Sequence, residues 1–325
     1  MFQAWMLIEE QGEVKLLKNN CEEKELLAGE VRVRVQYSGI NYKDRLACDP
    51  KSRVVRSFPM VPGVDFSGIV KESADPRFQP GEEVFLTGFG YGTDRFGGYQ
   101  EQVVAKAEHL LKLPEGMTLR EAMIYGTAGL TAAMSVDVLS RGLGSLKEKS
   151  ILVTGGTGGV ALHSILLLNT LGAQVTAATR DPKREGLLRA LGAKDVILFD
   201  TLAEKKKPLA KERWHGVVDT TGGSALGEML KEVSYGGVVA ASGNLSGISF
   251  ETTVFPFILR GVTLQGVDSV SVPLDKRKEL FLRLSKEWKS EKLEHFPVEE
   301  ISFAQLGEAL GQGQRKPGRT LVHLR

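Results

Sequence analysis

Cysteine is scarce in this chain, which has only Cys21 and Cys48 among 325 residues. Small proteins that rely on disulfides carry a much larger share of cysteine, so a disulfide framework is excluded as the basis of the fold. So few cysteines are typical of a protein kept in a reducing compartment. We therefore expect a cytoplasmic protein.

An excess of charge of either sign is also missing. The 42 Lys and Arg residues nearly balance the 40 Asp and Glu residues, which gives a formal net charge of +2. Proteins that bind nucleic acid or a membrane surface electrostatically usually carry a clear basic excess. We therefore expect neither nucleic acid nor membrane as a partner.

Long hydrophobic runs are absent as well, because no apolar stretch reaches the length of a membrane span. The first ten residues, MFQAWMLIEE, lack the basic region and the apolar core of a signal peptide. Hydrophobic residues make up 42% of the chain and charged residues 25%. This composition, with this length, indicates a soluble enzyme with two hydrophobic cores.

Glycine, in contrast, is concentrated in one informative stretch, residues 151–161, which read ILVTGGTGGVA. The pattern predicts a short buried strand, a glycine loop and an apolar helix over residues 160–171. Such a loop brings backbone N–H groups and a helix N-terminus up to an anion, so it predicts a pyrophosphate site. The spacing is G-x-x-G-x-x-A, and the strict fingerprint is G-x-G-x-x-G. We expect the cofactor to contact Gly155, Thr157, Gly158, Gly159 and Val160.

Further strands are predicted after this motif, with helical stretches between several of them. They cover residues 174–178, 196–199, 216–220 and 237–242. Strands that alternate with helices favour an α/β fold with a doubly wound parallel sheet of the Rossmann type. The alternative is a glycine-rich turn that only links elements of an α/β domain without a nucleotide.

The end of the second predicted strand bears on which dinucleotide is bound. NAD-binding domains usually carry an acidic residue there, but residues 175–179 contain none. Thr179, Arg180 and Lys183 follow instead, which favours the 2′-phosphate of NADPH. Asp181 is the competing candidate, but an Asp before Pro182 is also typical of a helix start. The basic side chains could equally be a solvated helix face.

The first 120 residues are mostly predicted strands and turns, and they are too long for a leader. Val31, Val33 and Val35 alternate with polar residues, as in a half-buried strand. A last strand is predicted over residues 320–324, and we expect this tail to return to the first domain. We place one domain at residues 1–123, completed by 295–325, and the Rossmann domain at 124–294.

Seven segments together resemble a known family over nearly the whole chain. The chain is similar to zinc-free medium-chain dehydrogenase/reductases of the quinone oxidoreductase branch, within it the acryloyl-CoA reductase (YhdH/YhfP-like) group. The resemblance implies a GroES-like, mostly β catalytic domain built from both chain ends, NADPH as cofactor, and a homodimer. It rests on SGINYKD (38–44), FPMVPGVDFSG (58–68), YGTAGLTA (125–132), TGGTGGV (154–160), YGGVVAASG (235–243), FPFILRGVTLQGVDS (255–269) and GRTLV (318–322).

Zinc ligands are missing where related alcohol dehydrogenases carry them. In place of a cysteine and a Gly-His-Glu segment, this chain has residues 41–44, NYKD, and residues 63–65, GVD. A structural zinc site would need clustered cysteines, and the two present lie 27 positions apart. We expect no metal.

Without a Lewis acid, a conjugated C=C bond is a better hydride acceptor than a simple ketone, because its carbonyl delocalises the charge. Hydride would reach the β-carbon and a proton the α-carbon. The resemblance places Asn41 and Tyr42 beside the nicotinamide as catalytic residues, with an amide donor and a hydroxyl. Alternatively, Asn41 makes a turn, Tyr42 packs in a core, and Asp44 pairs with Lys43 or Arg45.

Other cofactor contacts are expected at strand ends and near the C-terminus. Thr220 and Gly243 follow two predicted strands, where ligands gather in open α/β sheets. A satisfied hydroxyl and a turn glycine would explain them equally. Leu264 is a weaker candidate, and the resemblance adds Gln314, although an exposed loop also explains Gln314.

The expected activity is reduction of acryloyl-CoA with NADPH. A quinone or enal reductase is the alternative enzyme, and a non-catalytic NADPH-binding protein is a third possibility. One basic set could receive the phosphates of CoA, or it could be a solvated face. This set consists of Lys43, Arg45, Lys51, Arg53 and Arg56.

Overall fold

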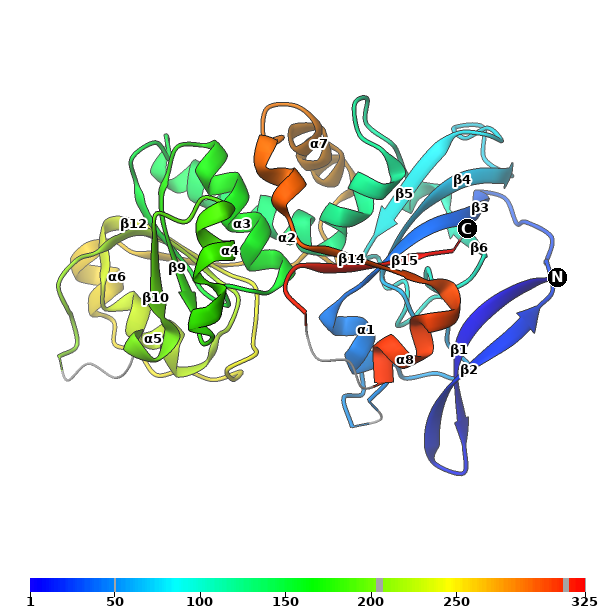
Figure 1. Ribbon diagram of the computed structural model, residues 1–325, viewed down its shortest axis with the longest axis horizontal. Helices are drawn as coiled ribbons and strands as arrows, with labels where there is room; N and C mark the ends of the chain where they lie inside the picture. The colour runs from blue at the N-terminus through cyan, green and yellow to red at the C-terminus, as the bar shows by residue number, and fades with distance from the viewer. Residues whose placement is uncertain (50, 203–206, 312–315, 325) are drawn as a thin grey trace. The chain divides into compact units, whose positions relative to one another are not determined.

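The computed structural model describes every residue except 50, 203–206, 312–315 and 325, and the chain divides into two compact units (Figure 1). The first unit comprises Met1–Thr127, Val270–Ser285 and Pro297–Arg325, and the second comprises Ala128–Ser269 and Lys286–Phe296. Residues 270–285 thus group with the first unit. The domain limits expected from the sequence stay a prediction.

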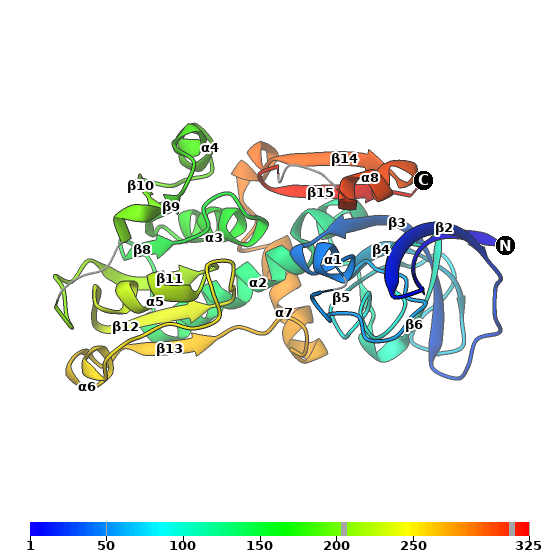
Figure 2. The same cartoon turned by 90° about the horizontal axis from the view of Figure 1, so that it is seen from below.

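A six-stranded parallel sheet forms the centre of the second unit (Figure 2). Its order is β10-β9-β8-β11-β12-β13, so the chain order reverses between β8 and β11. This is the strand order 3-2-1-4-5-6 of a Rossmann sheet, which confirms the predicted α/β fold class. The strands are β8 (Ser150–Val153), β9 (Gln174–Thr179), β10 (Asp195–Leu198), β11 (Trp214–Asp219), β12 (Val233–Ala241) and β13 (Thr263–Gly266).

The sixth strand, β13, was not expected from the sequence. It lies at the sheet edge, and three of its four residues are exposed. An exposed edge strand has no apolar run to reveal it. The other five strands match their expected positions to within a few residues. Four of them lie inside the sheet and are short apolar runs, and the edge strand β10 still carries an apolar run at residues 196–198.

The helix after the glycine loop is buried almost all round. It is α3 (Gly159–Thr170), in which residues 161–168 are all buried. Because α3 is buried on nearly all sides, its sequence is apolar all round and lacks the polar face of a surface helix. The remaining helices of the unit are α4 (Glu185–Ala190), α5 (Gly223–Leu230) and α6 (Phe255–Arg260), with short 3-10 turns η2 (Pro182–Arg184), η3 (Phe199–Leu202) and η4 (Glu291–His295).

One helix, α2 (Leu119–Leu143), is long and apolar enough to cross a membrane. The expectation that no apolar stretch reaches that length is therefore wrong. However, 89% of its most apolar window is buried inside the protein, so α2 is a core helix. The backbone at Gly126 is not helical, with φ of 48°, and it kinks the helix.

The first unit is built on a mostly antiparallel sheet in the order β14-β15-β3-β4-β5-β7, and β6 also pairs with β3. A separate hairpin joins β1 (Phe2–Glu10) to β2 (Glu13–Cys21). The strands of the sheet are β3 (Glu30–Ile40), β4 (Asp65–Ser73), β5 (Glu83–Thr87), β6 (Gln102–Lys106), β7 (Leu111–Lys112), β14 (Val298–Ser302) and β15 (Arg319–His323). The helices are α1 (Tyr42–Ala47), α7 (Leu274–Ser285) and α8 (Leu306–Gly311), with 3-10 turns η1 (Ala107–His109) and η5 (Phe303–Gln305).

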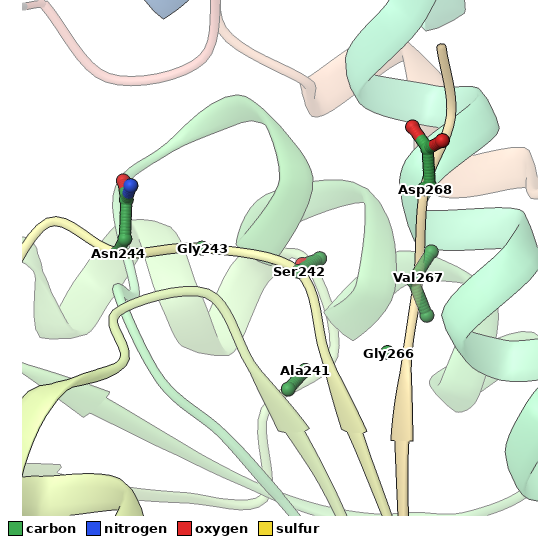
Figure 3. A pocket seen from close by; sticks show the side chains of 7 residues that line it. All are labelled: Ala241, Ser242, Gly243, Asn244, Gly266, Val267 and Asp268. Atoms are coloured by element: carbon green, nitrogen blue, oxygen red, sulfur yellow. The ribbon is translucent and has the colours of Figure 1, made fainter. Parts of the chain in front are cut away.

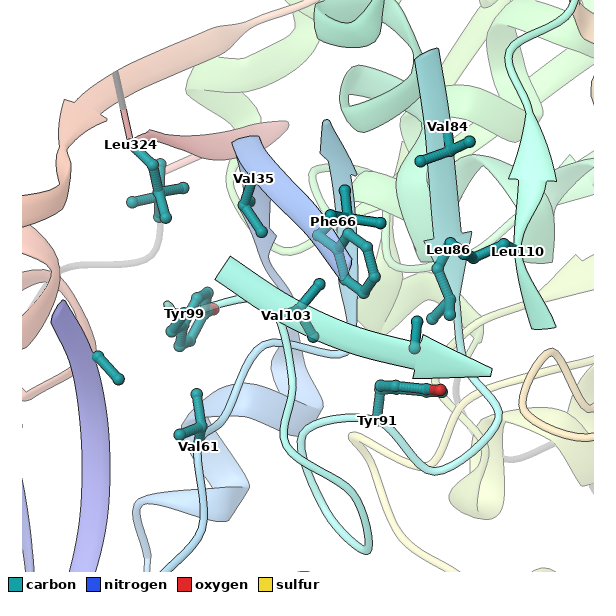
Figure 4. Close-up of a cluster of buried hydrophobic side chains, with 14 of the residues drawn as sticks. Val35, Val61, Phe66, Val84, Leu86, Tyr91, Tyr99, Val103, Leu110 and Leu324 are labelled. Atoms are coloured by element: carbon teal, nitrogen blue, oxygen red, sulfur yellow. The ribbon is translucent and has the colours of Figure 1, made fainter. Parts of the chain in front are cut away.

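Both ends of the chain contribute to this sheet. The last strand, β15, lies antiparallel to β3, as the red and blue arrows in Figure 1 show. Val35, Phe66, Tyr99 and Val322 belong to one buried cluster beneath it, part of which is drawn in Figure 4. The prediction that the tail returns to the first unit is confirmed, since β15 fills an interior position of that sheet.

Candidate functional site

The glycine loop between β8 and α3 is packed too closely for larger residues. Gly155 has φ of 72°, and a Cβ there would lie 2.2 Å from Thr220 Oγ1. A Cβ on Gly156 would lie 2.8 Å from the carbonyl oxygen of Ala178. The tight turn therefore requires glycine at both positions, for conformation at the first and for space at the second.

The N-terminus of α3 has the properties of an anion site. Gly158 is its N-cap, with no side-chain cap, and the first turn holds no acidic residue. Gly158 is exposed, and Thr157, Gly159 and Val160 are partly exposed. The first amides of a helix have no intrahelical acceptor, so they are available to a ligand. The loop and helix thus fit the pyrophosphate of a dinucleotide.

The strand ends at the reversal of chain order are tied together by hydroxyl groups. Thr154 Oγ1 donates to Asp219 Oδ1 over 2.7 Å, and the Thr220 backbone N–H donates to Thr154 Oγ1 over 3.0 Å. The hydroxyl of Thr220 itself donates to the carbonyl of Thr154 at 2.9 Å. Thr220 therefore has the contacts of a satisfied strand hydroxyl, and its cofactor contact stays a prediction.

The end of β9 presents the basic side chains expected there. Arg180 is exposed, donates from its guanidinium to Ser246 Oγ over 2.9 Å, and lies 4.6 Å from the centre of the Phe199 ring. Lys183 is exposed in the following turn, while Thr179 is buried. The role of Ser246 was missed, because it lies 66 residues from Arg180 in the sequence.

Asp181 starts the next helical turn, as its neighbour Pro182 suggested. Its carboxylate accepts the backbone N–H of Lys183 over 3.0 Å and pairs with Arg184 at 3.0 Å. The cap therefore accounts for this acid locally.

An open pocket lies where β12 and β13 end (Figure 3). Gly243 lines it, and a Cβ there would lie 1.9 Å from the carbonyl oxygen of Thr220. Leu264 does not line it, since its side chain packs against the hydrophobic core. Gly243 is the one lining residue expected from the sequence; Gly266, Val267 and Asp268 were missed because β13 had no strand signal. The lining residues are Ala241, Ser242, Gly243, Asn244, Gly266, Val267 and Asp268. Gln314 lies outside the described residues.

In the first unit, α1 begins at the predicted catalytic pair. The Asn41 backbone N–H donates to Asp44 Oδ2 over 2.8 Å, which fixes the start of the helix. Tyr42 is its first residue, and 44% of its side chain is exposed. The alternative that Tyr42 packs in a core is therefore wrong. Asp44 does not pair with Lys43 or Arg45, because it caps backbone groups.

A buried ion pair holds the side chain of Asn41. Arg319 Nη2 lies 3.3 Å from Asp65 Oδ2, and both side chains are almost fully buried. Asn41 donates to Asp65 Oδ2 over 2.9 Å and accepts from Arg319 Nη1 over 2.7 Å. Both ends of the Asn41 amide are thus hydrogen-bonded inside the unit. A Cβ on Gly39 or Gly126 would meet the same guanidinium, at 2.0 or 2.5 Å.

Asp44 is a second buried carboxylate close to this pair. Its Oδ1 accepts the backbone N–H groups of Gly63 and Val64, at 3.1 and 3.0 Å. Burial raises the pKa of Asp44 from 3.8 to about 6, and the Asp65 carboxylate raises it as well, against the backbone donors that lower it. One carboxylate therefore joins the start of α1 to the segment before β4.

Metal ligation has no candidate among the described residues, where no group of three or more His, Cys, Asp or Glu side chains is placed to hold an ion. The segments that replace the zinc ligands instead supply Asn41 and Asp65 to the Arg319 network. That the enzyme uses no metal stays a prediction.

Comparison with known proteins agrees with both units. Residues 27–115 match the family model of the alcohol dehydrogenase GroES-like domain, and residues 159–286 match that of zinc-binding dehydrogenase. The Escherichia coli protein named "Probable acrylyl-CoA reductase AcuI" is 41% identical, over 98% of this chain and 99% of its own.

Two solved structures resemble the chain over its full length. One is the yhdH oxidoreductase from Salmonella enterica in complex with NADP, 41% identical with a TM-score of 0.93, covering 99% of this chain and 100% of that chain. The other is the Bacillus subtilis protein yhfP with NAD bound, 39% identical with a TM-score of 0.95, covering 99% of each.

The raised pKa of Asp44 predicts a pH-dependent stability. The folded protein holds this proton more tightly than the unfolded chain, so stability falls as the pH rises from about 4 to about 6. Across the whole titration the free energy of unfolding should fall by about 3 kcal/mol, because each pKa unit corresponds to ~1.36 kcal/mol. Asp44→Asn has no proton to lose and should show a smaller fall. Urea unfolding of both proteins across this range checks it, and parallel pH profiles would contradict it.

Proposed function

The chain belongs to the medium-chain dehydrogenase/reductase family, in its acrylyl-CoA reductase group, and from this we propose that it reduces the activated C=C bond of acryloyl-CoA with NADPH. The observation that carries the proposal is the similarity, at about 40% identity over the whole chain, to a protein named for that activity. The glycine loop supports it independently, because its geometry suits a dinucleotide.

The cofactor would be held by residues of the second unit. We assign its pyrophosphate to the glycine loop and the first turn of α3, where Gly155 to Val160 lie. We assign the 2′-phosphate to Arg180 and Lys183, both exposed at the end of β9, with Thr179 beside them. Thr220, Gly243 and Leu264 remain proposed contacts. When bound, NADPH supplies the hydride.

The acyl group would react beside α1. Addition of hydride to the β-carbon of an enoyl thioester moves negative charge to the thioester oxygen, and a proton then bonds to the α-carbon. We propose that Tyr42, an exposed residue, donates a hydrogen bond from its hydroxyl to that oxygen or delivers the proton. Both roles require a donor that is not buried.

Asn41 acts on this site in one of two ways. As a donor to the thioester oxygen, it would use the second N–H of its amide, whose contact with the carbonyl of Gly39 is long, at 3.5 Å. As a positioning residue, it would keep the bonds to Asp65 and Arg319 and hold the first turn of α1, which carries Tyr42. The observed contacts favour positioning, and donation remains the expectation from the family resemblance.

We further propose that two copies associate through the edge of the Rossmann sheet. β13 is an edge strand, so on one side it has no neighbouring strand within the described part of the chain. Exposed apolar side chains occur in and just before α6, the helix that precedes β13. A grouped set of this kind usually marks a protein interface. It consists of Val254, Phe255, Ile258 and Leu259.

Location in the cytoplasm is also proposed. Cys21 and Cys48 are both free thiols, as expected of a protein in a reducing compartment. Fractionation of cells that express the protein would check the location, and recovery with the membrane fraction would contradict it.

The activity is tested by consumption of NADPH with acryloyl-CoA, crotonyl-CoA and a benzoquinone under identical conditions. We expect saturable turnover of acryloyl-CoA with the highest kcat/KM. Tyr42→Phe should lower kcat by about 100-fold, the usual contribution of a proton donor. Tyr37→Phe is the control, since this half-buried ring stacks on His323 in the same unit. Preference for the quinone would instead favour a quinone reductase, and binding of NADPH without turnover a non-catalytic protein.

Cofactor choice is tested at Arg180. Arg180→Gln should raise KM for NADPH by about 10-fold or more, because a charge-assisted contact to phosphate is lost. KM for NADH, which lacks the 2′-phosphate, should be unchanged. Arg184→Gln is the matched control, because that guanidinium pairs with Asp181. Equal effects on both cofactors would place the 2′-phosphate elsewhere.

Association is tested by substitution in the apolar set before β13. Ile258 is 68% exposed, and Ile258→Glu places a charge on that surface. The variant should run as a monomer at concentrations where the original chain is a dimer, measured by light scattering after size exclusion. Leu27→Glu, at an exposed apolar residue of the first unit, should leave the mass unchanged. A dimer that survives Ile258→Glu would argue against this surface.

A further inference from the structure

We propose that the segment over residues 43–56, here called the basic segment, binds the phosphates of the CoA portion of the substrate. The inference rests on the proposed function, because it concerns the part of an acyl-CoA that does not react. Five of the fourteen residues in this segment are basic, against two acidic ones.

Four of the five cations of the basic segment form no ion pair within the described part of the protein. Among the described residues, no ion pair involves Lys43, Lys51, Arg53 or Arg56. Several exposed cations elsewhere in this unit are paired: Lys71 lies 2.8 Å from Glu23, Arg77 lies 2.8 Å from Asp75, and Lys112 pairs with Glu82. The basic segment thus keeps its positive charge available to an anion.

The acidic residues of the segment do not neutralise it. Asp44 is fully buried and accepts backbone N–H groups. Asp49 is exposed, and its carboxylate accepts the backbone N–H of Lys51 over 2.9 Å. The net charge facing the solvent is therefore clearly positive.

The basic segment is fixed on its inner side. Ala47 and Val55 are buried in one apolar cluster with Leu7 and Met60. Between them, Ser52 Oγ donates to the carbonyl of Asp49 over 2.8 Å and holds the turn. With these residues inside, Lys51, Arg53 and Arg56 are exposed on the outer side. Their backbone is placed before any ligand arrives, which reduces the entropy lost on binding.

The position of the basic segment in the chain suits the shape of an acyl-CoA. It continues directly from Tyr42, where we place the reacting acyl group, through Lys43 in α1 to Arg56. Arg45 is engaged by the protein, since it donates to the carbonyl of Ala309 over 2.7 Å. The pantetheine arm would lead away from Tyr42 and bring the pyrophosphate and the 3′-phosphate to these cations. Arginine suits this task because it binds phosphate oxygens through two N–H groups.

Two substrates with the same reacting group separate this role from catalysis. Acryloyl-pantetheine carries the same thioester as acryloyl-CoA but no phosphate. In the triple variant Lys51→Gln/Arg53→Gln/Arg56→Gln, kcat/KM for acryloyl-CoA should fall about 10–100-fold, as expected for three charge-assisted contacts. For acryloyl-pantetheine it should change less than about twofold, and KM for NADPH should stay the same. Arg56→Gln alone should show a smaller loss of the same selectivity.

A control and a salt series make the comparison sharper. Lys24 is exposed on the same unit and lies outside the basic segment, so Lys24→Gln should affect neither substrate. Added salt should lower kcat/KM for acryloyl-CoA more in the original chain than in the triple variant, because salt screens exposed charges.

Two results would overturn the proposal: an unchanged kcat/KM for acryloyl-CoA in the triple variant, or equal losses with both thioesters. If the original chain reduces neither thioester, the proposed function fails by itself. Titration calorimetry with free CoA then tests the basic segment separately. Tighter binding of CoA by the original chain than by the triple variant supports it, and equal or absent binding overturns it.

Discussion

The arrangement of the first unit around Asn41 depends on the buried ion pair between Asp65 and Arg319. Two opposite charges out of water are stable only with close geometry and additional hydrogen bonds, and both are present. Asp65 accepts the backbone N–H groups of Gly39 and Thr127, at 3.0 and 2.8 Å, and Arg319 donates to the carbonyl of Met123 over 3.2 Å. Strands β3, β4 and β15 and the start of α2 therefore meet at one pair of charges.

This pair also explains how the start of α1 is held in place. The Asn41 side chain bridges Asp65 and Arg319, and its backbone is capped by Asp44. Tyr42 follows directly, so this exposed residue starts from a fixed turn. The basic segment extends from the same turn. The two roles proposed for this region, reaction at Tyr42 and binding of CoA phosphates, thus concern neighbouring parts of the chain.

The second unit depends on a different constraint, the close approach of backbone to backbone. Gly155 and Gly243 both lie against Thr220, where a single added carbon would collide. The loop after β8, the end of β11 and the loop after β12 are therefore packed together at the carboxyl edge of the sheet. Ligands of doubly wound sheets bind at this edge.

The sequence by itself determined the fold class, five of the six Rossmann strands and the glycine loop. These are local patterns: buried strands are apolar runs, and a tight anion-binding turn needs glycine. The helix cap at Asp181 could also be predicted, because an Asp followed by Pro182 is a local pattern. Tertiary structure alone decided the rest. The edge strand β13 has no apolar signal, the partnership of Arg180 with Ser246 spans 66 residues, and that of Asn41 with Arg319 spans 278. Pairing between distant polar side chains leaves no periodicity in a sequence, because only folding brings them together.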